Sequence, residues 1–220
     1  MEKMPYGVGL NGVVQAPAQD VSSSDWQRAL PALSRGRIKL REMCSSDAAS
    51  LCALLTTKEV TRFISPPPPT VEGFKQFIEW THRQRSAGTY ACFAVTLDGH
   101  DTAIGLFQIR ATEPGFGTAE WGFALGSPFW GTGVFQNAAD LVIAFVFEIL
   151  GTGRLEARTA VENGRGNGAL LKVGAVQEGI LRRSFSRNGK YLDQVLYAIL
   201  QDDWSASREA APRVPHVRVH

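Results

Sequence analysis

One stretch of the chain decides the fold: Trp121-Gly122-Phe123-Ala124-Leu125-Gly126-Ser127-Pro128-Phe129-Trp130-Gly131-Thr132-Gly133-Val134-Phe135. Its first part is typical of a strand, and its end opens a long apolar helix. The first turn of a helix carries four backbone N–H groups without partners, and the helix dipole makes that end positive. Because Gly131 and Gly133 have no Cβ atoms, an anion can come close to these N–H groups. We therefore expect a phosphate to bind at this turn.

Three phosphate-binding patterns compete for the turn. A P-loop needs GxxxxGK[ST]; Gly126 and Gly131 have that spacing, but Thr132 stands where the lysine must be. A dinucleotide fingerprint needs GxGxxG in a parallel βαβ unit, whereas Gln136 takes the third glycine position and a predicted meander comes first. The third pattern is the acyl-CoA loop, Q/R-x-x-G-x-G/A, which asks for two glycines that open a helix after a strand. Taken alone, the two glycines also fit a tight turn that binds nothing.

Predicted strands and helices alternate on both sides of this turn. Apolar alternation and turn residues predict strands at 37–42, 90–97, 103–110, 119–125, 154–160, 176–185 and 191–200. Capping residues and helical spacing predict helices at 46–57, 70–87, 133–150 and directly after Asn163. This order predicts an α+β fold (α/β mixed), with an antiparallel meander that leads into one βαβ crossover. We expect a central, twisted, mixed and mostly antiparallel sheet of about seven strands, with helices on both faces.

The two ends of the chain differ from its middle. Residues 1–34 carry Gly, Pro and Ser without sustained periodicity, so we expect an irregular N-terminal arm with one short helix from Ser24. Residues 35–204 are predicted to form the domain. Residues 205–220 are expected to be a loosely ordered tail.

Composition is typical of a soluble domain. The 220 residues are 44 % hydrophobic and 20 % charged, which suffices for one core without disulfides. The formal net charge of +2, without a basic run, argues against a nucleic-acid partner. The longest apolar stretch, Leu141–Phe147, is far too short to cross a bilayer, so no membrane is expected. The odd trio Cys44, Cys52 and Cys92 predicts reduced thiols in the cytoplasm and no metal site.

Five segments have the order and spacing of one family's motifs: Glu120-Trp121-Gly122-Phe123, Trp130-Gly131-Thr132-Gly133, Asn163 with Lys172-Val173-Gly174, Glu178-Gly179-Ile180-Leu181-Arg182, and Asp193 through Tyr197 to Trp204. Together they resemble the GNAT superfamily over residues 36–204, and within it the branch of ribosomal-protein N-terminal acetyltransferases RimJ and RimL. The resemblance implies the GNAT (acyl-CoA N-acyltransferase) fold. It also implies an enzyme that transfers an acetyl group from acetyl-CoA to a primary amine, by direct attack in a ternary complex.

The resemblance further implies where acetyl-CoA binds. In the family, the strand before the loop diverges from its neighbour, the pantetheine lies in the gap, and the helix N-terminus holds the pyrophosphate. Asn163 matches a position that touches the cofactor, and it also suits the cap of its own helix. The implied acetyl-CoA-binding residues are Phe123, Ala124, Leu125, Trp130, Gly131, Thr132, Gly133, Val134, Phe135, Asn163 and Asn167.

Glu120 matches the family's frequent carboxylate and is the implied catalytic residue. An ammonium is no nucleophile, so a base must remove its proton, directly or through water. A solvated strand glutamate is the alternative interpretation. The resemblance places the oxyanion at a strand N–H, that of Phe123 or Ala124. Tyr197 is interpreted as a core residue, with the role of general acid as the less favoured alternative.

The chain departs from the family at three positions. Gly166 stands where a serine is common, Asn137 replaces a usual glutamate, and Pro128 occupies the Q/R position of the loop. The first two keep a second function open, that of a non-catalytic acyl-CoA-binding module, and a nicotinamide enzyme is a distant third. The expected acceptor is a peptide N-terminus or a small-molecule amine. A homodimer is a possible assembly.

Overall fold

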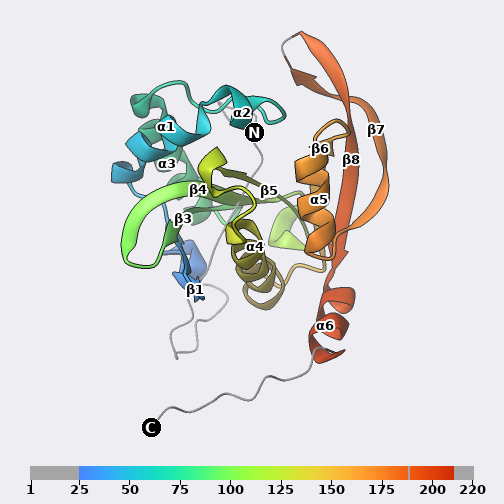
Figure 1. Cartoon of the computed structure of the whole chain (residues 1–220). Helices are drawn as coiled ribbons and strands as arrows, with labels where there is room; N and C mark the ends of the chain where they lie inside the picture. Colours follow the sequence, from blue (N-terminus) through green and yellow to red (C-terminus); the bar gives the residue numbers. More distant parts are fainter. Residues whose placement is uncertain (1–24, 188, 211–220) are drawn as a thin grey trace.

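This computed structural model describes residues 25–187 and 189–210. Within them, eight strands form a single sheet (Figure 1). The strands lie in the order β1-β2-β3-β4-β5-β6-β8-β7, and the pair of β5 with β6 is parallel. Their bounds are β1 (Leu33–Arg35), β2 (Ile38–Glu42), β3 (Tyr90–Leu97), β4 (His100–Ala111), β5 (Thr118–Leu125), β6 (Arg154–Ala160), β7 (Val176–Arg187) and β8 (Lys190–Leu200). The mixed, mostly antiparallel sheet is confirmed, with eight strands where about seven were expected.

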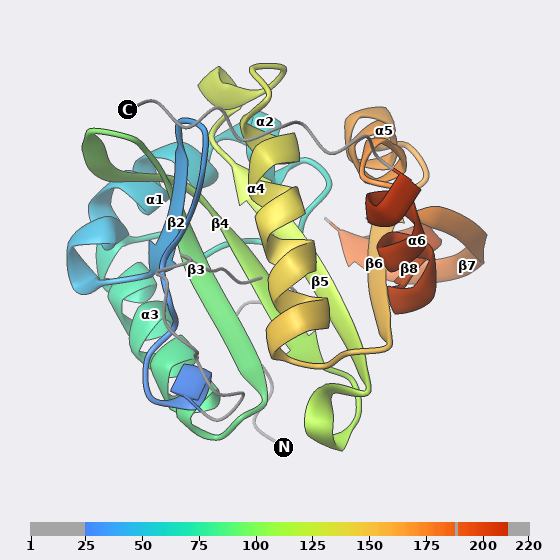
Figure 2. The same ribbon diagram turned by 90° about the horizontal axis from the view of Figure 1, so that it is seen from below.

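Helices cover both faces of the sheet, as expected (Figure 2). On one face lie α1 (Ala48–Leu55), α2 (Lys58–Thr61) and α3 (Val71–Ser86), whose apolar side chains form a buried cluster with β3 and β4. The opposite face carries α4 (Val134–Ala144), α5 (Gly164–Lys172) and α6 (Gln201–Ala210). The apolar helix predicted at 133–150 ends in a π-helical turn, Phe145–Ile149, in which the Leu150 N–H donates to the Phe145 carbonyl at 3.0 Å.

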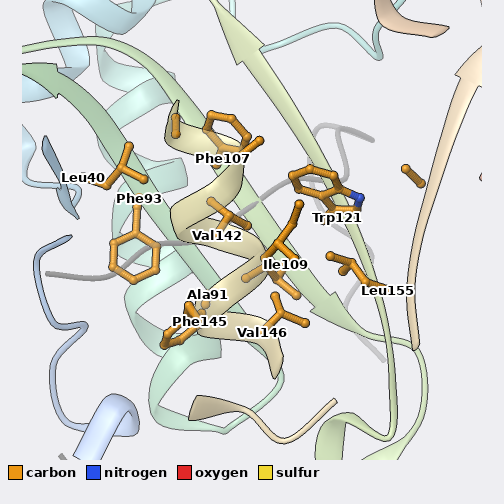
Figure 3. Packing of buried hydrophobic residues seen from close by; sticks show 14 of the residues in the cluster. Leu40, Ala91, Phe93, Phe107, Ile109, Trp121, Val142, Phe145, Val146 and Leu155 are labelled. Atoms are coloured by element: carbon orange, nitrogen blue, oxygen red, sulfur yellow. The ribbon is translucent and has the colours of Figure 1, made fainter. Parts of the chain in front are cut away.

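Aromatic rings fix the start of α4 against the sheet. Trp121 of β5 is 2 % exposed, and its ring stacks on Phe107 with 6.1 Å between centroids. Phe135, in the first turn of α4, lies 5.8 Å from Phe107 and 4.4 Å from Phe123. Figure 3 shows Phe107 and Trp121 within this core, beside Val142 of α4. The turn between β5 and α4 is therefore anchored on both sides.

The predicted connections around this turn are confirmed. Strands β3, β4 and β5 form the antiparallel meander, and α4 crosses over to the parallel strand β6. The hairpin of β3 and β4 turns tightly at Asp98-Gly99, where Leu97 pairs with His100 and Gly99 has φ of +77°. Such a left-handed conformation is the one that glycine adopts without strain.

The structure differs from the sequence expectation at both ends of the domain. Residues 33–35 form strand β1, which pairs with β2, although the irregular arm was predicted to reach residue 34. A three-residue strand is too short to show alternation. Residues 201–210 form α6, although the loose tail was predicted from residue 205. This helix is polar and is held by Trp204, whose ring lies 5.2 Å from that of Phe147. Residues 1–24 and 211–220 lie outside the described residues.

Two further short elements lie outside the main pattern: the first is where the short helix after Ser24 was expected, and the second was not expected. A 3-10 helix at Asp25–Gln27 places Trp26 edge-on to Phe116, with 5.6 Å between ring centroids. Helix α2 follows the predicted helix at 46–57 after a break, with Thr57 as the cap that accepts from the Val60 N–H. Among the described helices, none is both long enough and apolar enough to span a membrane.

Candidate active site

The turn between β5 and α4 has the geometry of an anion site. Gly131 and Gly133 have φ of +75° and +83°, a region that favours glycine, and Gly133 is the N-cap of α4. The first helical hydrogen bond runs from the Asn137 N–H to the Gly133 carbonyl at 3.2 Å. The N–H groups of Val134 and Phe135 precede that bond, so they are available to a ligand.

The turn forms one wall of a long cleft of about 1270 Å³. Three cationic side chains line this cleft, Arg62, Arg165 and Lys172, against the single carboxylate of Glu59 among the described lining residues. The guanidinium of Arg165 lies over the ring of Trp130, 3.9 Å from its centroid. The indole Nε1–H of Trp130 donates to the Leu125 carbonyl at 2.9 Å, which ties the turn to β5. The excess of positive charge suits a polyanionic ligand.

Strands β5 and β6 pair over only three positions. Thr118, Ala119 and Glu120 face Arg154, Leu155 and Glu156. Beyond Glu120, β5 remains paired with β4, while its other edge leaves β6. The cleft begins where this pairing ends, because Phe123, Ala124 and Leu125 line it. An extended ligand could therefore bond to the free backbone edge of β5 in the manner of an added strand.

Most of the residues predicted to bind acetyl-CoA come together here. Those that line the cleft are Phe123, Ala124, Leu125, Trp130, Gly131, Gly133, Phe135 and Asn163. Thr132 and Val134 belong to the same turn without lining the cleft; the Thr132 hydroxyl donates to the Phe129 carbonyl at 2.7 Å, and the Val134 side chain is buried. Their N–H groups are the part that a phosphate would contact, so all ten assignments stay predictions.

Asn167 is the predicted ligand that the structure places elsewhere. Its Nδ2 donates to the carbonyls of Ala160 at 3.1 Å and Asn163 at 2.9 Å. Its Oδ1 accepts the hydroxyl proton of Tyr197 at 3.0 Å, and burial raises the pKa of that phenol. Both ends of the amide are thus used within the fold. We therefore assign Asn167 the role of fastening α5 to β6 and β8, and Tyr197 lies in the core as expected.

Gly166 has a structural reason for replacing the family's serine. Asn163 Oδ1 accepts from the Gly166 N–H at 3.0 Å, which caps α5, while its Nδ2 donates to Thr159 Oγ1 at 3.2 Å. A Cβ atom on residue 166 would collide with Asn163 Nδ2 and would lie 2.8 Å from Thr159 Oγ1. The cap and a side chain at position 166 cannot both be accommodated in this arrangement.

Glu120 lies at the point where β5 and β6 separate, on the face of the sheet that carries α1 and α3. Its side chain is 13 % exposed, and its Oε2 accepts from Arg158 Nη1 at 2.6 Å and from Arg110 Nη2. Arg158 also donates to Glu156 at 3.1 Å. One carboxylate oxygen of Glu120 is therefore engaged by two guanidinium groups. The residue borders the cleft without lining it.

Several lining residues escaped the sequence interpretation. Arg165 and Lys172 carry a readable signal, because both follow Asn163 on the predicted helix. Arg62 and Ile64 come from the connection after α2, and nothing in their local sequence points to a cleft. That connection is tied to the hairpin of β7 and β8, since Arg187 Nη2 donates to the Thr61 carbonyl at 2.8 Å. Within the described residues, no cluster of His, Cys, Asp and Glu could hold a metal ion.

Comparison with known proteins gives a consistent result. Residues 37–176 match the family model of the acetyltransferase (GNAT) domain. An uncharacterized N-acetyltransferase, p20, of Bacillus licheniformis is 27 % identical over 77 % of this chain and 96 % of its own. The ribosomal-protein-S5-alanine acetyltransferase of Vibrio fischeri superposes with a TM-score of 0.68 at 22 % identity, covering 79 % of this chain and 98 % of that one. Mycobacterium smegmatis RimJ in complex with CoA-disulfide gives 0.67 at 21 %, covering 78 % and 89 %.

Proposed function

Because the chain belongs to the GNAT family of acyl-CoA-dependent N-acetyltransferases, we propose that it acetylates a primary amine, either a protein N-terminal α-amine or a small-molecule amine. The amine attacks the thioester of acetyl-CoA directly, with both substrates bound at once. The observation that carries the proposal is the cleft itself. It joins a free strand edge at Phe123–Leu125 to a helix N-terminus at Gly133.

Acetyl-CoA fits this cleft by the chemistry of its parts. The pyrophosphate is assigned to the N–H groups from Trp130 to Phe135, and Arg165 and Lys172 supply the opposite charge. The pantetheine amides are assigned to the edge of β5 from Phe123 to Leu125, where the Phe123 N–H and carbonyl and the Leu125 N–H point outward. The Leu125 carbonyl already accepts from Trp130 Nε1–H, and the backbone of Ala124 faces β4. A neighbour of the same fold, RimJ of Mycobacterium smegmatis, was solved with CoA-disulfide. That complex supports the assignment without fixing any residue of this chain.

The reaction forms a C–N bond and breaks the C–S bond of the thioester. The acceptor's ammonium first loses one proton and becomes the attacking amine. As the amide forms, the nitrogen loses a second proton, which neutralises the departing CoA thiolate. The N–H of Phe123 is assigned to the oxyanion, because it lies on the edge of β5 that is unpaired next to the cleft. The N–H of Ala124 faces β4 instead, since the Gly126 N–H donates to the Ile104 carbonyl and hydrogen-bonded pairs alternate along the ladder. A thiol with an ordinary pKa near 8.5 leaves without strong acid help, so Gly166 in place of serine does not prevent turnover.

Glu120 is the proposed acceptor of the ammonium proton, acting through water. Its Oε2 already accepts from Arg110 and Arg158, so direct abstraction by that oxygen is disfavoured. The other oxygen, Oε1, can still receive a proton from a water molecule that bridges to the amine. Both arginines also fix the carboxylate at the mouth of the gap between β5 and β6.

The test is a panel of amines incubated with acetyl-CoA and purified protein. Thiol release together with an acetylated product by mass spectrometry is the result that the proposal predicts. Peptides with free and with blocked N-termini separate α-amine transfer from other acceptors. The alternative, a non-catalytic acyl-CoA-binding module, is favoured by the double ion pair of Glu120. It predicts acetyl-CoA binding with no thiol release from any member of the panel.

We further propose a cytoplasmic location. Cys44, Cys52 and Cys92 are free among the described residues, which suits a reducing compartment. Cys92 is buried, and burial raises the pKa of its thiol well above the ordinary value. A homodimer stays a proposal as well, and analytical ultracentrifugation at enzyme concentrations used for turnover would test it.

A further inference from the structure

Gln108 of β4 is a buried polar side chain without a hydrogen-bonding partner. The residue is 0 % exposed, and neither Nε2 nor Oε1 has a partner among the described residues. A buried carboxamide without partners is costly to the folded state. An apolar residue of the same length would avoid that cost, so we expect the amide to have a partner that the described residues do not supply.

The space around this amide is small and otherwise apolar. A cavity of about 20 Å³ lies against Gln108, walled by Leu55, Ile64, Pro67, Pro68 and Phe77. Among the described residues that line this cavity, Gln108 is the one with a polar side chain. A space of this size admits one water-sized group, because a water needs roughly 10–15 Å³ of such volume. The occupant must therefore be small, and it must meet both a donor and an acceptor.

The cavity lies next to the proposed place of transfer. Gln108 pairs with Gly122 across β4 and β5, between the pairs Leu106–Ala124 and Arg110–Glu120. These residues project from the same face of the sheet, because side chains two apart on a strand share a face. Ala124 and Ile64 line both the small cavity and the long cleft. If the amine of an acceptor reaches the edge of β5, the substituent next to that amine would therefore lie against the side chain of Gln108.

We propose that Gln108 recognises a hydroxyl group that the acceptor carries close to its reactive amine. A hydroxyl matches a water molecule in size, and like water it both donates and accepts. A methyl group in the same place would leave both amide atoms unpaired, and a carboxamide or carboxylate is larger than the cavity. This inference rests on the proposed acetyl transfer and narrows its acceptors to amino alcohols, including peptides that begin with a hydroxyl-bearing residue.

Matched pairs of acceptors test the inference. Tripeptides that begin with serine or with 2-aminobutyrate differ in one hydroxyl against one methyl, as do ethanolamine and propylamine. We expect kcat/KM for the hydroxyl member of a pair to exceed that of the other by at least about tenfold, since a site with buried polar groups rejects analogues that leave them unpaired. In Gln108→Met the preference should disappear, with acetyl-CoA affinity unchanged. Gln177→Met, at an exposed glutamine of β7, is the matched control.

The outcomes separate this inference from the proposed function. If wild-type protein binds no acetyl-CoA, the proposed function fails. If it binds acetyl-CoA but favours no hydroxyl member of either pair, the inference is wrong. If the preference exists and survives in Gln108→Met, then Gln108 holds a buried water only and the inference is equally overturned. Because methionine removes the unpaired amide, this variant should fold at least as well as the wild type.

Discussion

At the scale of single residues, Glu120 is the side chain that we propose as the proton acceptor. Its carboxylate lies where β5 leaves β6, and Arg110 and Arg158 both donate to its Oε2. A glutamate that is only a solvated strand residue would be more exposed than 13 %. The same two ion pairs would also stabilise the local structure, so geometry alone gives the residue two possible roles.

Glu120→Gln separates these roles. The amide keeps the shape and can still accept from the arginines, but it cannot take a proton. We expect kcat to fall by about 10²–10⁴-fold, the usual contribution of general-base catalysis, with acetyl-CoA affinity nearly unchanged. Glu156→Gln is the matched control, because Glu156 pairs with Glu120 across the strands and shares Arg158. Equal losses of kcat in both variants would assign the effect to the ion-pair network.

Gly166 is the second residue whose identity the structure explains. A serine there would collide with Asn163 and so disturb the cap of α5. We expect Gly166→Ser to lower the free energy of unfolding by about 1–3 kcal/mol, the usual cost of overpacking. Gly168→Ser in the same helix has open space within 4 Å and should have little effect. Denaturant unfolding measures both, and equal stabilities would show that Asn163 moves aside freely.

At the scale of elements, the site depends on how β5 is held. Its outer edge faces the cleft, so within the sheet β4 is the strand that pairs with its second half, from Trp121 to Leu125. Gly105 of β4 pairs with Leu125 of β5, and the two backbones lie close together at this pair. A Cβ atom at residue 105 would collide with the Ala124 carbonyl and would lie 2.9 Å from Leu125 Cα. Both are backbone atoms of the segment assigned to the pantetheine.

Gly105→Ala should therefore displace the proposed binding strand. We expect a loss of about 1–3 kcal/mol in unfolding free energy, together with a higher KM for acetyl-CoA. The control is Gly179→Ala, a glycine in strand β7 with no atom within 4 Å of the added Cβ. If Gly105→Ala left both quantities at wild-type values, the close approach of β4 to β5 would have no role in binding.

The sequence predicted the long elements well, because their signals are local. Alternation between 90 and 125, the Asp98-Gly99 turn and the apolar helix after Gly133 are enough to give the meander and the crossover. Strand β1 and helix α2 are too short for any periodicity to show. The hydrogen bond from Tyr197 to Asn167 Oδ1 spans 30 residues, and the amide of Gln108 has no partner among the described residues, so local sequence could not reveal either.

The same limit applies to the site. Glycine spacing located the turn, and the family resemblance supplied the strand edge and Glu120. The charged wall of Arg62, Arg165 and Lys172 became visible only when α2 and α5 were placed on opposite sides of one cleft. The two guanidinium partners of Glu120 come from β4 and β6, and only the sheet register brings them together.

At the scale of the whole molecule, one contact joins the first strand to the central helix. Arg35 of β1 pairs with Asp140 of α4 at 2.9 Å, with the Asp140 side chain 34 % exposed. Burial raises the pKa of the Asp140 carboxyl, and the nearby Arg35 and Arg208 oppose that shift only in part. Hence the folded state holds this proton at pH values where the unfolded state has lost it.

This shift predicts a pH dependence of stability with a definite sign. Stability from this group is greatest below the ordinary carboxyl pKa of 3.8 and falls as pH rises from there through the raised folded value. Asp140→Asn removes the charge, so at neutral pH the variant should melt at the same temperature as wild type or higher. The difference should vanish near about pH 3, where the carboxyl is protonated in both states. If Asp140→Asn were less stable than wild type at neutral pH but equally stable at about pH 3, the ion pair with Arg35 would contribute more to stability than the burial of the carboxylate costs.

The binding of acetyl-CoA at the glycine turn is tested most directly by comparing its affinity for two alanine variants. Gly133 and Gly151 flank the helical segment 134–149, which joins α4 and the π-helical turn, and their φ angles are +83° and +69°. A Cβ atom added at either glycine meets no atom closer than 3.9 Å. Each alanine should cost about 1–2 kcal/mol of stability, since both positions are left-handed. By calorimetric titration, we expect the Kd for acetyl-CoA to rise about tenfold, or about 1.4 kcal/mol, in Gly133→Ala and to stay unchanged in Gly151→Ala. Equal affinities in the two variants would show that the cofactor does not bind at the turn of Gly133.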